Sequence, residues 1–187
     1  EVIVATTDRD CDNNLSDVAI DCGAKTYRGE LNDVVDRYYG ASKKFEATVT
    51  VKANGDNPLL STEVIELGIN QSINQNNVLT GKNAFTGLPV GIGAEIIPSD
   101  AVNWLYSNIP SQFRDDPTNF IFQQNTIIKP VSIKVPDKWK MVNGSITIDT
   151  PDNLEYLKKV ITSLPKYGSK HWSIDMIINA MKENING

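Results

Sequence analysis

The chain has 187 residues, 40% of them hydrophobic and 22% charged, which is enough for one globular domain with a full core. The formal net charge of −5 argues against a nucleic-acid-binding protein, and no apolar run is long enough for a transmembrane helix. Two cysteines, Cys11 and Cys22, are too few for a disulfide framework, so we expect both to be reduced, as in a cytoplasmic protein.

The N-terminal segment predicts a strand followed by a helix. We expect a short strand over 2–6, in which residues 2–5 are apolar without alternation, as suits a strand that is covered on both faces. Residues 13–22 repeat apolar residues at helical spacing, with Asn13 or Asn14 as the cap and Gly23 at the end. We expect the buried stripe of this helix to consist of Leu15, Val18, Ala19 and Cys22.

The pattern then continues with a strand, a helix and another strand. We expect strands at 25–28 and 47–53, and between them a helix over 32–45 that Asn32 caps. The apolar side of this helix is Val34, Val35, Tyr38, Ala41 and Phe45. This alternation predicts an α/β fold with a mostly parallel sheet that is flanked by helices.

The remainder of the chain continues in the same manner and contains no linker that would divide it, so we expect a single domain over residues 1–187. Residues 113–124 favour neither helix nor strand. In chain order we expect a helix over 61–70, a polar loop at the rim of a cleft over 71–83, a glycine-containing strand over 88–98, and a helix from 100 onward that Ser99 caps. Two strands, over 127–135 and 145–150, and two helices, over 152–164 and 173–183, follow. The apolar side of the helix over 152–164 is Leu154, Leu157, Val160, Ile161 and Leu164.

Two aspartates stand in the same surroundings, at the end of a strand and two residues before a proline. Asp56 follows the strand over 47–53, and Asp149 falls near the end of the strand over 145–150. Ligands of open α/β sheets bind beyond the carboxyl ends of the strands, and Mg²⁺ is usually held there by one or two carboxylates plus substrate phosphates. Two simpler interpretations stay open: Asp149 as a helix N-cap, and Asp56 as a turn residue.

Other ionisable residues carry weaker signals. Glu95 lies in an otherwise apolar strand, where an unpaired carboxylate is costly, so it calls for a partner or a function. The single histidine, His171, has no serine or cysteine constellation around it, and we interpret it as a surface or packing residue. No metal-binding or phosphate-loop motif with a trusted spacing is present.

Five segments, in this order, resemble the cytidylyltransferases of the spore-coat polysaccharide biosynthesis type: VIVATTDRD, YRGELNDVVDRYYGA, VKANGDNPL, LPVGIGAEI and SITIDTPDNLEYLKKVI. These enzymes are related to those that make CMP-activated Kdo and sialic acid, and the similarity runs from residue 2 to about residue 161. The resemblance implies a GT-A-like nucleotidyltransferase of the cytoplasm. Such an enzyme transfers a nucleoside monophosphate from CTP to a sugar or sugar acid, with release of pyrophosphate, in surface polysaccharide biosynthesis.

The resemblance also implies roles for particular residues. Asp56 and Asp149 would hold Mg²⁺ as the acids of the GD-x-PL and DTP motifs. Asp36 and Arg37 would act in catalysis and line the cleft for nucleotide and sugar, with Arg28 nearby. Glu95 would contribute to substrate binding, and the segment 83–95 is a possible homodimer contact.

The chain also departs from the family pattern. By the resemblance, a first βα unit with a triphosphate-binding loop should precede position 1, so we expect this chain on its own to be inactive with CTP. Gly93 stands where relatives tend to have an acid, and residues 114–118 match only loosely. Two alternatives stay open: a non-catalytic sugar- or nucleotide-binding or assembly relative, and a GT-A glycosyltransferase.

Overall fold

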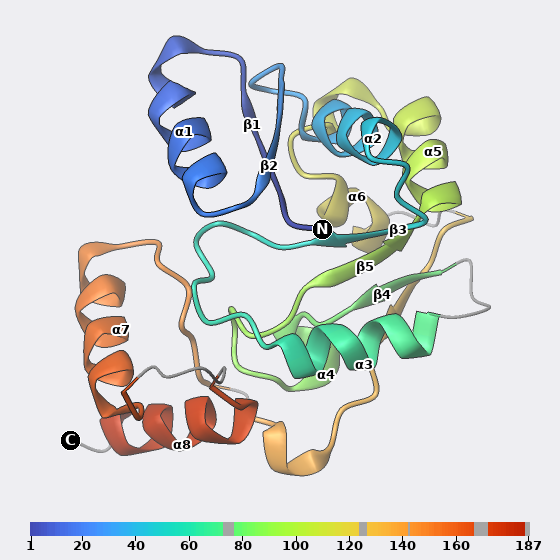
Figure 1. Ribbon diagram of the computed structural model, residues 1–187. Coiled ribbons are helices and arrows are strands. Elements are labelled where there is room, and N and C mark those ends of the chain that lie inside the picture. Colours follow the sequence, from blue (N-terminus) through green and yellow to red (C-terminus); the bar gives the residue numbers. More distant parts are fainter. Residues whose placement is uncertain (73–76, 124–126, 142, 167–171, 186–187) are drawn as a thin grey trace. The chain divides into compact units, whose positions relative to one another are not determined.

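The computed structural model describes residues 1–72, 77–123, 127–141, 143–166 and 172–185 (Figure 1). The chain groups into two compact units that interleave in sequence, one formed by 1–50 with 97–130 and the other by 51–96 with 131–187. The expectation of one domain over residues 1–187 stays a prediction. Within the described residues, no helix combines the length and the apolar composition that crossing a bilayer requires.

The first unit begins with a strand, a helix and a strand, as the sequence predicts. Strands β1 (Ile3–Thr7) and β2 (Lys25–Gly29) pair in parallel, and the chain between them forms a short 3₁₀ turn (Asp10–Asp12) and helix α1 (Asn13–Asp21). Because parallel strands need a crossover connection, α1 supplies the link, and it packs against both strands. The last residue of each strand, Thr7 and Gly29, therefore lies at the same end of the pair.

The buried face of α1 differs from the predicted stripe. Ser16 and Ala19 are buried, whereas Leu15 is 49% and Val18 59% exposed, and Cys22 is exposed as well. Each buried residue comes one position after an exposed apolar one, so the packed face is rotated by about 100° from the expected one. Small side chains let this helix approach the strands closely. Gly23 ends the helix with φ +81°, as expected of a C-terminal glycine.

The rest of the first unit is mostly helical. It contains α2 (Val34–Lys44), α5 (Ser99–Asn108), a 3₁₀ turn (Ser111–Phe113) and α6 (Pro117–Gln123). Helices α2 and α5 lie side by side (Figure 1), and the rings of Tyr39 and Tyr106 stack with their centroids 3.8 Å apart. The segment 113–124, for which the sequence favoured neither state, thus contains a helix.

The N-termini of α2, α5 and α1 correct three predicted caps. Asp33, and not Asn32, caps α2, because its Oδ1 accepts a hydrogen bond of 2.8 Å from the backbone N–H of Asp36. Pro98 occupies the cap position of α5 without a side-chain bond, so the assignment of Ser99 as a cap is wrong. In α1 the cap position belongs to Asp12, again without a side-chain bond, and not to Asn13 or Asn14.

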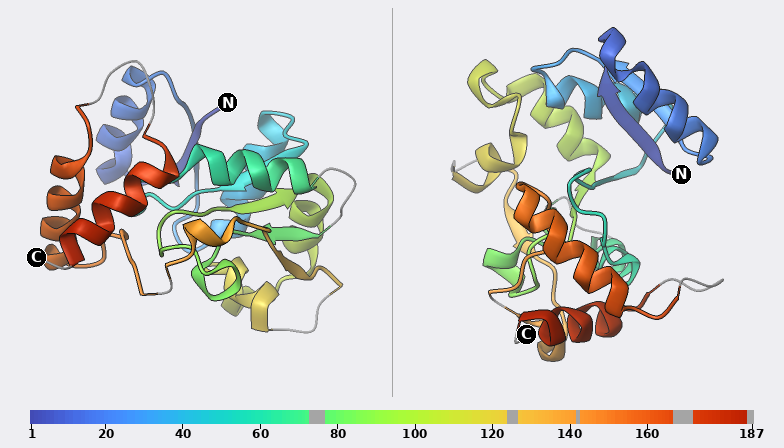
Figure 2. Two further views of the ribbon diagram at one scale, coloured as in Figure 1. Left: turned by 90° about the horizontal axis from the view of Figure 1, so that it is seen from below. Right: turned by 90° about the vertical axis from the view of Figure 1, so that its left-hand side faces the viewer.

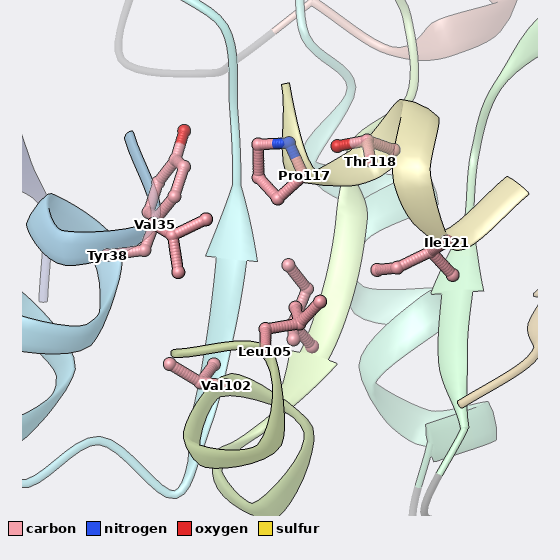
Figure 3. A pocket seen from close by; sticks show the side chains of 8 residues that line it. Val35, Tyr38, Val102, Leu105, Pro117, Thr118 and Ile121 are labelled. Carbon is pink, nitrogen blue, oxygen red and sulfur yellow. The ribbon is translucent and has the colours of Figure 1, made fainter. Parts of the chain in front are cut away.

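A small cavity of about 20 Å³ lies among the helices of the first unit (Figure 3). Its lining is almost entirely apolar: Val35, Tyr38, Ile97, Val102, Leu105, Pro117, Thr118 and Ile121. This volume holds at most one water molecule, and the lining gives that water few polar partners. We interpret the cavity as imperfect core packing and not as a ligand site.

A four-stranded sheet has the order β3-β5-β4-β6. Its strands are β3 (Val49–Lys52), β4 (Val78–Thr80), β5 (Glu95–Pro98) and β6 (Pro130–Ser132). Strands β4 and β5 run antiparallel, so the described sheets contain pairs of both directions. The interpretation of residues 71–83 as a polar loop is wrong for β4, which is fully buried.

The second unit adds helices α3 (Thr62–Ser72), α4 (Asn83–Thr86), α7 (Pro151–Ser163) and α8 (Ile174–Ile185), and a 3₁₀ turn (Asp137–Trp139). Helix α3 packs against β4, and α7 lies beside α8 in all views (Figures 1 and 2). Leu157 and Val160 of α7 are buried as predicted, whereas Leu154 and Ile161 are more than a third exposed at the edge of that face.

Three predicted strands are reduced. The predicted strand over 88–98 shortens to β5, the one over 127–135 shortens to β6, and the one over 145–150 is wrong as a strand. Its only described pairing is an isolated parallel bridge between Val90 and Ser145, where the Ile146 N–H donates to the Val90 carbonyl at 2.9 Å. The segment is nevertheless extended and runs toward the start of α7. His171 lies outside the described residues.

Candidate functional site

Asp56 lies in a tight turn that follows β3. The Asn57 N–H donates to the Asn54 carbonyl at 3.2 Å, which closes the turn around Gly55 and Asp56. Oδ1 of Asp56 is shielded from solvent and accepts no hydrogen bond from any described residue. A buried carboxylate oxygen without a donor destabilises the fold unless a cation or another ligand satisfies it. The role of a turn residue therefore explains the position of Asp56 but not its unpaired oxygen.

The segment before Asp149 lies directly against this turn. The Ile148 N–H donates to the Asp56 carbonyl at 2.9 Å, and Oγ1 of Thr147 donates to Oδ1 of Asn57 at 2.9 Å. These two bonds hold the turn over residues 55–58 beside the segment over residues 147–149. The structure therefore brings together the backbones that carry the two predicted metal ligands.

The carboxylate of Asp149 is not needed to start α7. Thr150 occupies the cap position, and its Oγ1 accepts from the Asn153 N–H at 3.2 Å. Oδ1 of Asn153 accepts in return from the Thr150 N–H at 3.0 Å, which completes a capping box. The interpretation of Asp149 as a helix cap is thus wrong, and its exposed side chain is left available for another role.

Two carboxylates from these adjoining segments form a donor set that suits a hard divalent cation. The described residues contain no group of three or more histidine, cysteine, aspartate or glutamate side chains that would hold a metal by themselves. Mg²⁺ does not need such a cage, since it commonly takes one or two carboxylates and completes its shell with water and substrate phosphates. The unpaired oxygen of Asp56 fits this arrangement, and the shared ion stays a prediction.

A cavity of about 390 Å³ adjoins the same turn in the second unit. Its lining combines polar side chains with glycines and two small apolar residues: Lys52, Asn54, Asn57, Gly81, Lys82, Ala84, Val90, Gly91, Gly93, Glu95 and Thr147. A volume of this size is typical of small-molecule sites. Asn57 and Thr147, which join the two carboxylate segments, thus also face this cavity.

Glu95 has a buried partner that the sequence did not reveal. Nζ of Lys52 lies 3.5 Å from Oε2 of Glu95, and the two side chains are 11% and 7% exposed. Nζ of Lys52 also donates to Oδ1 of Asn54 at 2.9 Å. Because β3 and β5 are neighbours in the sheet, a lysine at the end of one strand reaches a glutamate at the start of the other. The only available signal was a lysine that ends a β-branched strand, which is not specific.

Gly93 and Gly81 form part of the wall of this cavity. A Cβ atom on Gly93 would collide with the Gly81 carbonyl oxygen, and one on Gly81 would lie 2.8 Å from the Cα of Gly93. Any side chain at position 93, including the acid that the resemblance leads one to expect there, therefore does not fit without a shift of the backbone. Glycine at this position belongs to the shape of the cavity.

In the first unit, Arg28 holds the loop that follows β1. Its guanidinium donates to the Thr7 carbonyl at 2.8 Å, to the Arg9 carbonyl at 2.6 Å and to Oδ1 of Asn13 at 2.5 Å. In the same loop Oγ1 of Thr7 donates to a carboxylate oxygen of Asp12, and this bond lowers the pKa of Asp12. The contacts of Arg28 are thus structural, and its role in substrate binding stays a prediction.

Asp36 and Arg37 lie together at the carboxyl end of β2. Nη1 of Arg37 donates to the carbonyls of Glu30 and Leu31, the latter at 2.8 Å. A Cβ atom on Gly29 would lie 3.1 Å from Cγ of Arg37 and 3.7 Å from Oδ2 of Asp36, so both side chains pack around this glycine. This is the end of a parallel pair at which α/β proteins bind ligands. The catalytic roles of both residues stay predictions.

The comparisons with known proteins identify the family. The family model of the cytidylyltransferases matches residues 1–178, and the chain belongs to this family. It is 31% identical over 152 residues to "Uncharacterized protein MJ1063" of Methanocaldococcus jannaschii, covering 80% of this chain and 61% of that protein. It is 22% identical over 159 residues to the spore coat polysaccharide biosynthesis protein SpsF of Bacillus subtilis, covering 84% of this chain and 65% of that protein. The chain thus spans less than two thirds of the length of both relatives.

Solved structures agree with this assignment. A cytidylyltransferase from Leptospira borgpetersenii serovar Hardjo-bovis superposes with a TM-score of 0.86 at 25% identity, over 99% of this chain and 77% of that chain. CMP:2-keto-3-deoxy-manno-octonic acid synthetase, solved in complex with CTP, gives a TM-score of 0.55 at 13% identity, over 87% of this chain and 80% of that chain. The resemblance to cytidylyltransferases of the spore-coat type and the α/β nucleotidyltransferase-like fold are confirmed.

Proposed function

We propose that this chain carries a CTP-dependent sugar nucleotidyltransferase site, which transfers CMP to a sugar or sugar acid and releases pyrophosphate in surface polysaccharide biosynthesis. The family membership over residues 1–178 supports the class of reaction. The observation that carries the site is the buried, unpaired Oδ1 of Asp56, in a turn whose backbone is bonded to the residue before Asp149.

In the proposed reaction an oxygen atom of the sugar attacks the α-phosphorus of CTP. The bond from this phosphorus to the bridging oxygen of the β-phosphate breaks, and its electron pair leaves with pyrophosphate. A hydroxyl that attacks loses its proton to solvent, and the product is a CMP-sugar. Negative charge develops on phosphoryl oxygens during this step, so fixed positive groups lower the barrier.

Asp56 and Asp149 are the proposed ligands of Mg²⁺. A bound Mg²⁺ would neutralise charge on the phosphate oxygens and orient the triphosphate. Asp56 contributes an oxygen that has no other partner among the described residues, and Asp149 contributes a carboxylate that the start of α7 does not use. Arg37 is the proposed cation for the phosphates, because a guanidinium carries five donors and the described contacts of Arg37 to carbonyls use only Nη1.

Three finer expectations belong to the same proposal. The GT-A-like arrangement and the action in the cytoplasm follow from the resemblance. A homodimer through residues 83–95 is supported by two apolar side chains in this range, since Phe85 is 44% and Val90 42% exposed. Sedimentation equilibrium of wild-type protein and of Phe85→Ser distinguishes the dimer from a monomer.

The test is product analysis with CTP, Mg²⁺ and a mixture of sugars and sugar acids. Mass spectrometry identifies any CMP-sugar, and an enzyme-coupled assay measures pyrophosphate. The proposal is supported if wild-type protein forms both the CMP-sugar and pyrophosphate, if Asp56→Asn forms neither, and if Asp152→Asn still forms both. Asp152 serves as the control because it is an exposed acid that lies near Asp149 in the sequence. Absence of any CMP-sugar fits the expectation that the resemblance gives for these 187 residues, and the same assay is then decisive with a chimera in which the first βα unit of a relative precedes position 1.

The alternatives give different products in this assay. A non-catalytic relative binds CTP or a sugar without forming pyrophosphate. A glycosyltransferase consumes a nucleotide sugar and releases a nucleoside phosphate, again without pyrophosphate. If neither this chain nor the chimera releases pyrophosphate and a nucleotide sugar is used instead, the proposed reaction is wrong.

A further inference from the structure

Arg114 connects two segments of the first unit that lie far apart in the sequence. It begins the stretch 114–118, which matches the family pattern only loosely, and it contacts the start of helix α2. Nε of Arg114 donates to Oδ2 of Asp33 at 2.6 Å, and the Arg114 carbonyl accepts from the Val35 N–H at 3.1 Å. Both the side chain and the backbone of Arg114 therefore bind the first turn of α2.

The ion pair of Arg114 with Asp33 is held in one geometry. The two side chains are 20% and 24% exposed. Nη1 of Arg114 donates to the Tyr106 carbonyl at 3.1 Å, and the guanidinium carbon lies 5.2 Å from the centroid of the Tyr106 ring, which itself stacks on Tyr39. A guanidinium that a carboxylate, a carbonyl and an aromatic face hold at once keeps little freedom, unlike one in an exposed surface pair.

Asp33 transmits this geometry to two residues of the proposed site. One oxygen of its carboxylate accepts from Arg114, and the other, Oδ1, accepts from the Asp36 N–H at 2.8 Å. The backbone carbonyl of Asp33 accepts from the Arg37 N–H at 3.2 Å. The backbone positions of Asp36 and Arg37 thus depend on the orientation of Asp33, which Arg114 sets.

The guanidinium of Arg37 lies at the end of this series of contacts. Its Nη1 donates to the carbonyls of Glu30 and Leu31, which leaves Nε and Nη2 without a bonded partner among the described residues. If the first turn of α2 changed its orientation, these two bonds would break and the free donors would move. A cation that stabilises phosphoryl oxygens is most effective when it is held in place before the reaction.

We propose that Arg114 is a positioning residue for Arg37. Through Asp33 it fixes the first turn of α2, and it thereby holds the Arg37 guanidinium at the carboxyl end of β2. The inference rests on the proposed function, because it takes Arg37 as the cation for the phosphates. The simpler alternative is that the ion pair only strengthens the packing of α2 against α5, and the test separates the two.

The test measures the rate of rotation about the Nε–Cζ bond of Arg37 by ¹⁵N NMR on the complete chain. The bonds at Nη1 hinder this rotation, so in wild-type protein we expect it to be roughly tenfold slower than in free arginine. Arg114→Met removes the contact with Asp33 and is expected to bring the rate close to that of free arginine. The chain has four arginines, so each signal can be assigned by substitution. Arg28, which is bonded to the loop after β1, is the internal reference whose rate should stay unchanged.

Three further variants separate positioning from stability. Asp33→Asn removes the charge that orients Arg114 but keeps a helix cap, since asparagine also caps helices. It is expected to act as Arg114→Met does, and it keeps the test decisive if Arg114→Met does not fold. The double variant should add little to either single change, because both break the same pair. Val102→Ala removes buried atoms from α5 (Figure 3) and should lower the Tm without changing the rotation rate of Arg37.

Three outcomes overturn the inference: Arg37 that rotates in wild-type protein as fast as free arginine, a rate that neither Arg114→Met nor Asp33→Asn changes, or a rate that Val102→Ala raises as much as they do. Failure of the inference is distinct from failure of the proposed function. If the pair holds Arg37 but neither this chain nor the chimera forms a CMP-sugar, the positioning stands and the reaction is wrong. If Arg114→Met forms a CMP-sugar at the wild-type rate, cytidylyl transfer is confirmed and the positioning role is refuted.

Discussion

Replacing Asp56 with asparagine should stabilise the metal-free protein and abolish its response to Mg²⁺. Without metal, Oδ1 of Asp56 is a buried charged acceptor that finds no donor among the described residues. An unsatisfied buried polar group costs about 1–3 kcal/mol, and the neutral amide reduces this cost. We therefore expect Asp56→Asn to unfold at an equal or higher temperature than wild type in EDTA.

The sign should invert when Mg²⁺ is added. A ligand that binds only the folded state at about 100 times its dissociation constant stabilises it by about 2.7 kcal/mol. For a chain of this size each kcal/mol corresponds to a shift in Tm of roughly 2–4 °C. Wild-type protein should therefore melt several degrees higher in Mg²⁺ than in EDTA, whereas Asp56→Asn should melt at the same temperature in both.

Differential scanning calorimetry in EDTA and in Mg²⁺ measures both effects. Asp152→Asn is the matched control, because Asp152 is an exposed aspartate in the first turn of α7 and loses the same charge. The control should keep the wild-type response to Mg²⁺. Our interpretation of the unpaired Oδ1 of Asp56 is refuted if the Asp56→Asn variant is less stable than wild type in EDTA and still responds to Mg²⁺ as wild type does.

Three further variants test the surroundings of the site by urea unfolding. Thr150→Ala removes the cap of α7 and should lower the free energy of unfolding by about 1 kcal/mol; an unchanged value would contradict the capping box. Lys52→Met leaves Glu95 as a buried unpaired charge and should cost about 3–5 kcal/mol, most of which the added change Glu95→Gln should restore. Gly93→Ala places a methyl group against the Gly81 carbonyl and should cost about 1–3 kcal/mol; a neutral effect would show that this wall of the cavity yields easily.

The two segments in which an aspartate follows a predicted strand, at Asp56 and Asp149, could be recognised because they depend on local sequence. A β-branched strand, a glycine turn and a proline before the next helix placed Asp56 at the end of β3. The segment before Asp149 was predicted as a strand, but the structure makes it an extended stretch with one bridge to Val90. Its position beside the turn was still correct, since the bond from Ile148 to Asp56 needs only an extended backbone.

The errors arise where tertiary contacts outweigh local pattern. In α1, an apolar stripe at helical spacing predicted the buried face, but close packing on the strands selects the small residues Ser16 and Ala19. Strand β4 has three residues, which is too short for an alternation pattern to be recognised among polar neighbours. The periodicity of the sequence alone shows neither which face of a helix packs on the strands nor where so short a strand lies.

The parts of the site that the sequence could not predict are pairings between distant segments. Lys52 and Glu95 are 43 positions apart, and only the neighbouring positions of β3 and β5 in the sheet bring them together. The close approach of Gly81 and Gly93 has the same origin, because Gly81 directly follows β4 and Gly93 shortly precedes β5, its neighbour in the sheet. Prediction from one sequence supplied the candidate residues, and the topology supplied their partners.

Binding of Mn²⁺ in place of Mg²⁺, followed by electron paramagnetic resonance in the presence of CTP, tests most directly whether Asp56 and Asp149 share one ion. We predict that wild-type protein and Asp152→Asn bind one Mn²⁺ with similar affinity, and that Asp56→Asn and Asp149→Asn each weaken this binding at least tenfold. The double variant should be hardly weaker than either single variant, because both carboxylates act on the same ion. Wild-type affinity in both single variants would contradict the shared site.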